Sequence, residues 1–134
     1  MPPLSRRAVA VAAAAVLLAV AGVVVAGLLL RDRAEPRFRL AGASADRGRD
    51  ALIAYGCGSC HTIPGVPDAD ATVGPPLSGW ANRTYVAGML PNTPPELVRW
   101  ITNPQAVVPG NAMPDLGVSD PAARDMAAYL YGLR

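Results

Sequence analysis

The sequence predicts a small all-α domain that follows a single N-terminal transmembrane helix. Residues 8–30 form an uncharged run of Ala, Val, Leu and Gly. Three later stretches carry apolar residues at helical spacing, and the segments between them are rich in Pro and Gly without a convincing strand pattern. We therefore expect an anchor over residues 1–30, a tether over 31–44 and a folded domain over 45–134.

The apolar run is long enough to cross a bilayer. Its 23 residues reach ~35 Å as a helix, against a hydrocarbon core of ~30 Å. Arg6 and Arg7 precede it and Arg31 follows it. A cleaved signal peptide is the alternative, but its apolar region usually spans only about 7–15 residues. We interpret the run as a retained single-pass anchor, and whether it is cleaved stays open.

Three helices are predicted in the domain. The first covers about Ala45 to Tyr55 and contains apolar residues at i, i+3, i+4 and i+7. The second covers Pro94 to Thr102, with prolines suited to its first turn and Pro104 preventing its continuation. The third is capped by Ser119 or Asp120 and runs to Tyr131.

The charge distribution argues against nucleic acid as a partner. The net charge is +2, but residues 41–134 hold six arginines against eight acidic residues, and lysine is absent from the sequence. The basic excess therefore belongs to the flanks of the apolar run. A domain of about 90 residues buries a limited core, so a cofactor, metal or disulfide is expected to support it.

Both cysteines and the single histidine fall within five residues, Cys57-Gly58-Ser59-Cys60-His61. A structural zinc site needs four ligands, and only three Cys and His residues are present. A thioredoxin-like dithiol needs a βαβ scaffold, which the pattern does not show. A disulfide across two residues would close too short a loop to stabilise a domain.

A histidine directly after Cys-x-x-Cys is typical of covalent haem attachment. Two thioethers would bind the haem edge through Cys57 and Cys60, and His61 would then lie next to the iron. We therefore predict one haem c. No second histidine is available, so methionine is the natural sixth ligand.

Three methionines follow the apolar run. Met126 lies on the apolar face of the third predicted helix, where a core role is favoured. Met89 lies in an apolar turn, where packing alone is the alternative role. Met113 lies in an extended loop, Pro109-Gly110-Asn111-Ala112-Met113-Pro114, which can present a thioether to an open haem face. We favour Met113 as the axial ligand.

With these motifs, residues 45–134 resemble a class I cytochrome c. The resemblance implies a class I cytochrome c-like fold around one covalent haem, with Gly48 allowing the first and last helices to approach closely. It also implies that the carbonyl of Pro75 accepts a hydrogen bond from His61. Three further haem contacts are implied by the resemblance: Arg83 and Asn111 with propionates, and Trp100 against the macrocycle.

The segments from Leu90 to Leu97 and around Met113-Pro114 resemble the cytochrome c domains of subunit II of some bacterial haem–copper oxidases. The copper-binding domain of that subunit has no counterpart here, and one apolar run replaces its two spans. We expect an electron carrier or an electron-transfer subunit of an oxidoreductase complex, not an enzyme, at the outer, periplasmic face of a bacterial cytoplasmic membrane. Its expected partners are a quinol-oxidising complex and a haem–copper oxidase in a respiratory chain. The alternative is a haem enzyme or ligand-binding sensor with a displaceable sixth ligand.

Overall fold

The computed structural model describes residues 6–31 and 38–134. Residues 1–5 of the predicted anchor and 32–37 of the predicted tether lie outside the described residues. The chain divides into two compact units, Met1–Glu35 and Pro36–Arg134. Each unit is described separately below.

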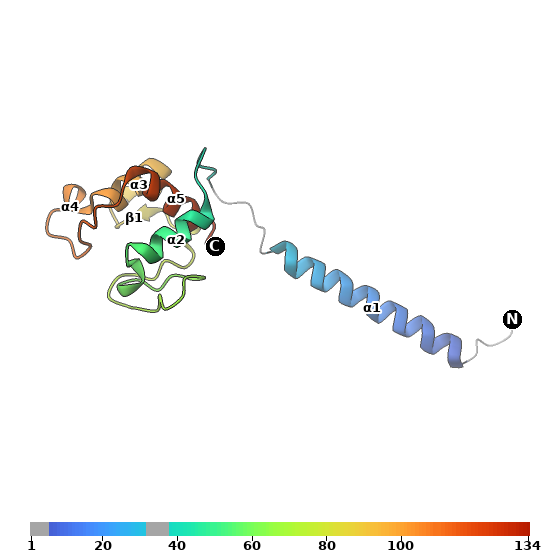
Figure 1. The fold of residues 1–134 in the computed structure, drawn as a ribbon. Helices are drawn as coiled ribbons and strands as arrows, with labels where there is room; N and C mark the ends of the chain where they lie inside the picture. Colours follow the sequence, from blue (N-terminus) through green and yellow to red (C-terminus); the bar gives the residue numbers. More distant parts are fainter. Residues whose placement is uncertain (1–5, 32–37) are drawn as a thin grey trace. The chain divides into compact units, whose positions relative to one another are not determined.

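The first unit contains one helix, α1, over Arg6–Arg31 (Figure 1). Within it Val9–Leu28, 20 residues long, is apolar enough to cross a membrane, and it would reach ~30 Å. The predicted apolar helix is therefore confirmed. A signal sequence near an N-terminus meets the same criteria of length and composition, so the helix is a candidate single span.

The second unit contains the three helices predicted from the sequence, with nearly the predicted bounds. They are α2 over Ala45–Ala54, α3 over Pro94–Thr102 and α5 over Asp120–Leu130. The caps follow the sequence as well, because the Ser44 hydroxyl accepts a hydrogen bond from the Arg47 amide at 3.3 Å and Ser119 caps α5. The unit is mostly helical, as predicted.

Several short elements were not predicted. Two 3-10 helices, η1 over Cys57–Ser59 and η2 over Trp80–Asn82, and a four-residue helix, α4, over Pro104–Val107 connect the longer helices. A small antiparallel hairpin pairs β1, Tyr85–Val86, with β2, Leu90–Pro91. Pro104 does stop α3, but with Asn103 as cap it also begins α4.

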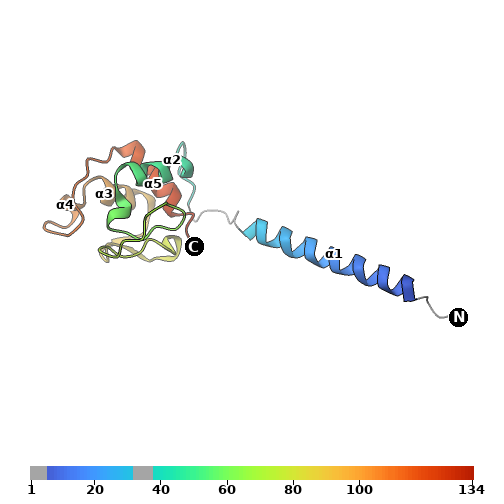
Figure 2. The same cartoon turned by 60° about the horizontal axis from the view of Figure 1, so that its bottom comes forward.

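The helices α2 and α5 lie against each other, in Figure 1 and in the turned view of Figure 2. Gly48 permits this contact, since a Cβ there would lie 2.9 Å from the backbone nitrogen of Met126 and would overlap the Asp125 carbonyl group. The core between the helices and the hairpin contains large side chains that are almost fully buried, including Leu52, Ile63, Val86, Leu97, Met126 and Tyr131.

The folded unit begins earlier than the predicted boundary at residue 45. The ring of Phe38 packs edge-on against Tyr131, with the ring centroids 4.8 Å apart. Leu40 is partly buried against the same core. The last part of the segment predicted as a tether therefore contributes to the packing of the second unit.

Candidate functional site

The Cys-x-x-Cys-His segment forms one tight turn directly after α2. Gly56 adopts a left-handed conformation, with φ 69°, and turns the chain from α2 into η1. The backbone amides of Cys60 and His61 then both donate to the carbonyl oxygen of Cys57, at 3.2 and 3.0 Å. These bonds fix the backbone positions from which the two thiols and the imidazole extend.

Both thiols are free and half-buried. Burial raises the pKa of Cys57, which the charge of Cys60 raises further against an opposing backbone hydrogen bond. Reactive redox cysteines have a lowered pKa, because the thiolate is the nucleophile. The environment of Cys57 is therefore opposite to the one that a thioredoxin-like dithiol requires.

The imidazole of His61 is fixed by the segment Gly74–Pro75. Its Nδ1 lies 2.8 Å from the carbonyl oxygen of Pro75, the contact that the family resemblance implies. A carbonyl can only accept, so Nδ1 carries a proton, and in the neutral imidazole the lone pair then lies on Nε2. A hydrogen-bonded Nδ1 with a free Nε2 is the usual arrangement of a metal-binding histidine.

Gly74 leaves no room for a side chain beside this ring. A Cβ at position 74 would lie 2.7 Å from Nδ1 and 3.1 Å from Nε2 of His61, and it would overlap Cε1. The backbone of Gly74 is itself fixed, because its amide donates to the carbonyl of Cys60 at 2.7 Å. The imidazole thus lies against the backbone of Gly74, which limits its rotation.

The three methionines of the described residues differ sharply in environment. Met126 is fully buried in the contact between α2 and α5, as its predicted core role requires. Met89 lies in the turn of the hairpin and is 63% exposed, so it does not pack as an apolar turn residue would. Met113 is half-buried in the irregular segment between α4 and α5. Of the three methionines in the described residues, Met113 alone is neither buried in the core nor largely exposed.

Asn111 directs its side chain into its own loop. Both of its amide hydrogens are donated to backbone carbonyls, to Pro104 at 2.9 Å and to Val108 at 2.7 Å. Its Oδ1 accepts a hydrogen bond from the Met113 amide. The structure therefore gives Asn111 a role in shaping the loop, with its donors already used.

Arg83 lies beside the loop that follows Pro75. Its guanidinium donates to the carbonyls of Pro76 and Ser78 and lies 4.8 Å from the ring centroid of Trp80. Burial lowers the pKa of Arg83, but an arginine remains charged at neutral pH. A half-buried cation thus lies next to the segment that contacts His61.

Trp80 is a residue that the sequence analysis did not single out. It is 5% exposed, and its buried indole N–H has no acceptor among the residues that the structure describes. A buried donor without an acceptor is costly, by about 1–3 kcal/mol. The signal in the sequence that could have identified Trp80 is its place three residues before Arg83, which was expected to bind a propionate. Trp100, which was singled out, is half-buried on α3 and packs against the core.

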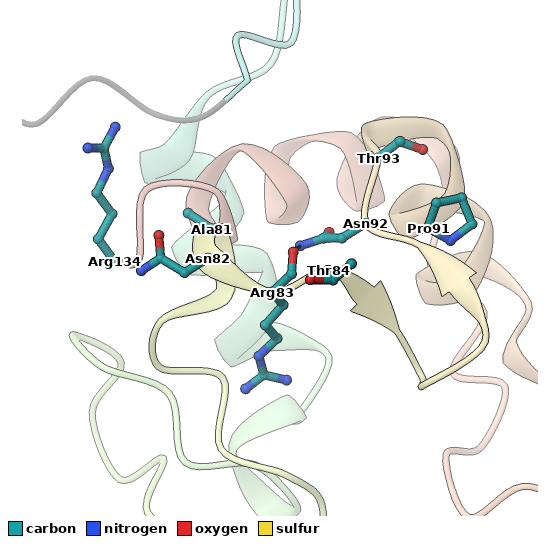
Figure 3. A pocket seen from close by; sticks show the side chains of 8 residues that line it. All are labelled: Ala81, Asn82, Arg83, Thr84, Pro91, Asn92, Thr93 and Arg134. Carbon is teal, nitrogen blue, oxygen red and sulfur yellow. Dashed lines mark hydrogen bonds between the residues drawn. The ribbon is translucent and has the colours of Figure 1, made fainter.

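A pocket of about 590 Å³ lies beside η2 and the hairpin (Figure 3), but its lining does not include the thiols, His61 or Met113. Figure 3 shows the guanidinium of Arg83 extending away from Asn92 and Pro91, which line this pocket. A second pocket, of about 580 Å³, lies between residues 39–41, α3 and α5. Arg83 is the one predicted site residue that lines the first pocket, and the second pocket is lined by none of them.

The structure also bears on the zinc alternative. Over residues 6–31 and 38–134 no group of three or more His, Cys, Asp and Glu side chains is placed to bind a metal ion. The donors near His61 are two sulfur atoms and backbone carbonyls. A four-ligand structural zinc site is not assembled from them.

Comparison with known proteins gives one relative. A cytochrome c oxidase subunit 2 from Alkalihalophilus pseudofirmus is 33% identical to the chain over 90 residues, which is 67% of this chain. The chain spans about a quarter of that protein's length, since the match covers 25% of it. No protein-family model matches the sequence. Over these 90 residues the chain is therefore similar to part of a cytochrome c oxidase subunit 2.

Proposed function

We propose that this protein is a membrane-anchored, mono-haem c-type cytochrome that carries single electrons in a respiratory chain. The observation that carries the proposal is the His61 imidazole, oriented by Gly74 and Pro75 within the turn that also contains two free thiols. Thiols and an oriented imidazole in this order match covalent haem attachment better than zinc binding or dithiol exchange.

The side chains around the turn fit a haem. Cys57 and Cys60 would form the two thioethers, and His61 and Met113 would ligate the iron. A haem with histidine and methionine ligands exchanges one electron and has a comparatively high reduction potential. The protein would contribute the ligands and their orientation.

Two further residues suit the haem's carboxylates. The buried indole N–H of Trp80 lacks an acceptor among the described residues, and the guanidinium of Arg83 lies against the same ring. A propionate would accept from Trp80 and would neutralise the half-buried charge of Arg83. The proposal does not use Asn111 for this purpose, because its donors are engaged in the loop.

The similarity to a cytochrome c oxidase subunit 2 supports a place near a terminal oxidase. In the proposed organisation α1 anchors the chain as a single span, and the haem domain lies at the periplasmic face. Electrons would come from a quinol-oxidising complex and pass to a haem–copper oxidase. Attachment to the membrane would raise the effective concentration of the domain near such partners.

The test compares methionine variants of the full chain in detergent. The wild-type protein should be low-spin in both redox states and should not bind carbon monoxide, whereas Met113→Ala should bind it. Met89→Leu is the matched control, since Met89 is exposed on the hairpin, and it should behave as wild type. Carbon monoxide binding by the wild-type protein would favour a sensor or enzyme with an open site. Binding by Met89→Leu and not by Met113→Ala would refute the ligand assignment.

A further inference from the structure

Both backbone polar groups of Met113 bind side-chain amides. The Met113 N–H donates to Oδ1 of Asn111 at 2.7 Å, and the Met113 carbonyl accepts from Nε2 of Gln105 at 2.7 Å. Residues 111–119 form no helix or strand. Met113 is therefore positioned by two side chains, in a segment where regular secondary structure does not fix the backbone.

Every hydrogen bond that the structure records for the Gln105 side chain is made to this loop. Besides Met113, its Nε2 donates to the Asn111 carbonyl at 2.9 Å, and its Oε1 accepts from the Gly110 amide at 3.0 Å. It extends from α4, the four-residue helix capped by Asn103. The sequence analysis did not single out Gln105.

The two amides support each other. Asn111 is oriented by the hydrogen bonds that its side-chain amide donates to the carbonyls of Pro104 and Val108. Pro104 is the first residue of α4 and Val108 directly follows α4, so the two carbonyls lie on either side of Gln105 in the sequence. Gln105 in turn binds the carbonyl of Asn111. All of these bonds connect α4 to the loop, so the small helix and the methionine form one hydrogen-bonded unit. Networks in which every member is satisfied give a single backbone conformation.

We propose that Gln105 is a positioning residue for the sixth iron ligand, which presents the Met113 thioether in one conformation and so sets how readily other ligands displace it. This inference rests on the proposed function. Its physical basis is preorganisation: a loop already held in the bound conformation loses little entropy when the sulfur binds. Without Gln105 the loop would populate conformations in which the thioether is off the iron, and external ligands would compete better.

The test measures the affinity of the ferric full-length protein for imidazole in detergent. Binding is monitored through the loss of the charge-transfer band of thioether-ligated ferric haem. Gln105→Glu keeps the size and the acceptor for Gly110 but removes both donations to carbonyls. Since each lost hydrogen bond weakens the bound conformation, imidazole affinity should rise about tenfold or more. Ser119→Ala, which removes the cap of α5, is the control for general destabilisation and should leave the affinity unchanged.

The outcomes separate the two proposals. A wild-type protein without the thioether band would overturn the ligand assignment and this inference together. A normal band, with the same imidazole affinity in wild type and Gln105→Glu, would overturn only the role of Gln105. If the variant does not fold, amide hydrogen exchange of the wild-type protein tests the role of Gln105 instead. The Gly110 amide, which donates to Oε1 of Gln105, should exchange at least about tenfold more slowly than the Ala112 amide, and equal rates would overturn the inference.

Discussion

Arg47 and Asp125 form a bidentate ion pair that joins α2 to α5. The Nε and one terminal nitrogen of Arg47 donate to the two carboxylate oxygens of Asp125 at 2.7 and 2.8 Å. The amide of Ser44, the cap of α2, also donates to this carboxylate at 2.7 Å. One acidic side chain on α5 therefore fixes the start of α2, the helix that leads into the Cys-x-x-Cys-His turn.

The ion pair predicts a specific acid sensitivity. Hydrogen bonding by Arg47 holds the pKa of Asp125 below its ordinary value against the opposing effect of burial, with smaller contributions from the Ser44 amide and the charge of Arg47. A lowered folded-state pKa gives stability that is present above the unfolded pKa of about 3.9 and is lost as pH falls through the folded value. As the pH drops below about 4, the free energy of unfolding should therefore decrease. Denaturant titration at several pH values measures this change.

Asp125→Asn should be less stable at neutral pH and should lose less stability on acidification. Asp50→Asn provides the control, because it removes the same charge from an exposed position whose partner Arg49 is 3.7 Å away. This control should keep the wild-type acid profile. An Asp125→Asn protein with an unaltered acid profile would show that the pair does not control the acid response.

Gly48→Ala should destabilise the protein although alanine favours helices. The new Cβ would overlap the Asp125 carbonyl, so α2 and α5 must separate. Overpacking of this kind costs about 1–3 kcal/mol, against a propensity gain of about 1 kcal/mol. Ala54→Gly, at an exposed position of the same helix, measures the propensity alone. If Gly48→Ala stabilises the protein by the amount that Ala54→Gly costs, the close contact is not present in solution.

Gly74→Ala tests whether the backbone at position 74 holds the His61 imidazole in its orientation. Its methyl group would displace the imidazole, which should weaken the bond to iron and produce a high-spin component in the absorption spectrum. Gly79→Ala is the control: position 79 has a positive φ, of 62°, which strains an alanine, but a Cβ there has nothing within 4 Å. It should cost stability without a spectral change. A normal spectrum in Gly74→Ala would indicate that the ring is free to move.

Trp80→Phe tests whether the indole N–H serves a haem carboxylate. A hydrogen bond to the charged form lowers the pKa of an acid, so its loss should raise the propionate pKa by about one unit or more. The pH at which the reduction potential begins to change should move upward accordingly. An unchanged pH profile, together with increased stability, would mean that the N–H is an unsatisfied donor whose removal is favourable.

The longer helices could be predicted because each contains enough residues to show helical spacing and a proline or serine at its start. The hairpin and α4 are two to four residues long and show no periodicity. The turn of the hairpin depends on positive φ at Ala87 and Gly88, and an alanine gives no sign of that conformation. Phe38 was placed in a tether because its packing against Tyr131 joins residues that are far apart in sequence.

The same distinction applies to the site. Cys57, Cys60 and His61 are adjacent in sequence, so their pattern was readable directly. The buried N–H of Trp80 and the bonds of Gln105 depend on the folded loops, and a single sequence contains no information on which loops meet. Asn111 was given a haem contact by resemblance, whereas its local hydrogen bonds are visible only in the structure.

The mass of the intact protein purified from membranes tests the central claim most directly. We predict a polypeptide heavier by one haem, with pigment that acid-acetone does not extract, and loss of this stable product in the double variant Cys57→Ser, Cys60→Ser. The same spectrum locates the N-terminus, and retention of residues 8–30 would support the anchor. An unmodified mass, or haem that is fully extractable, would contradict the account.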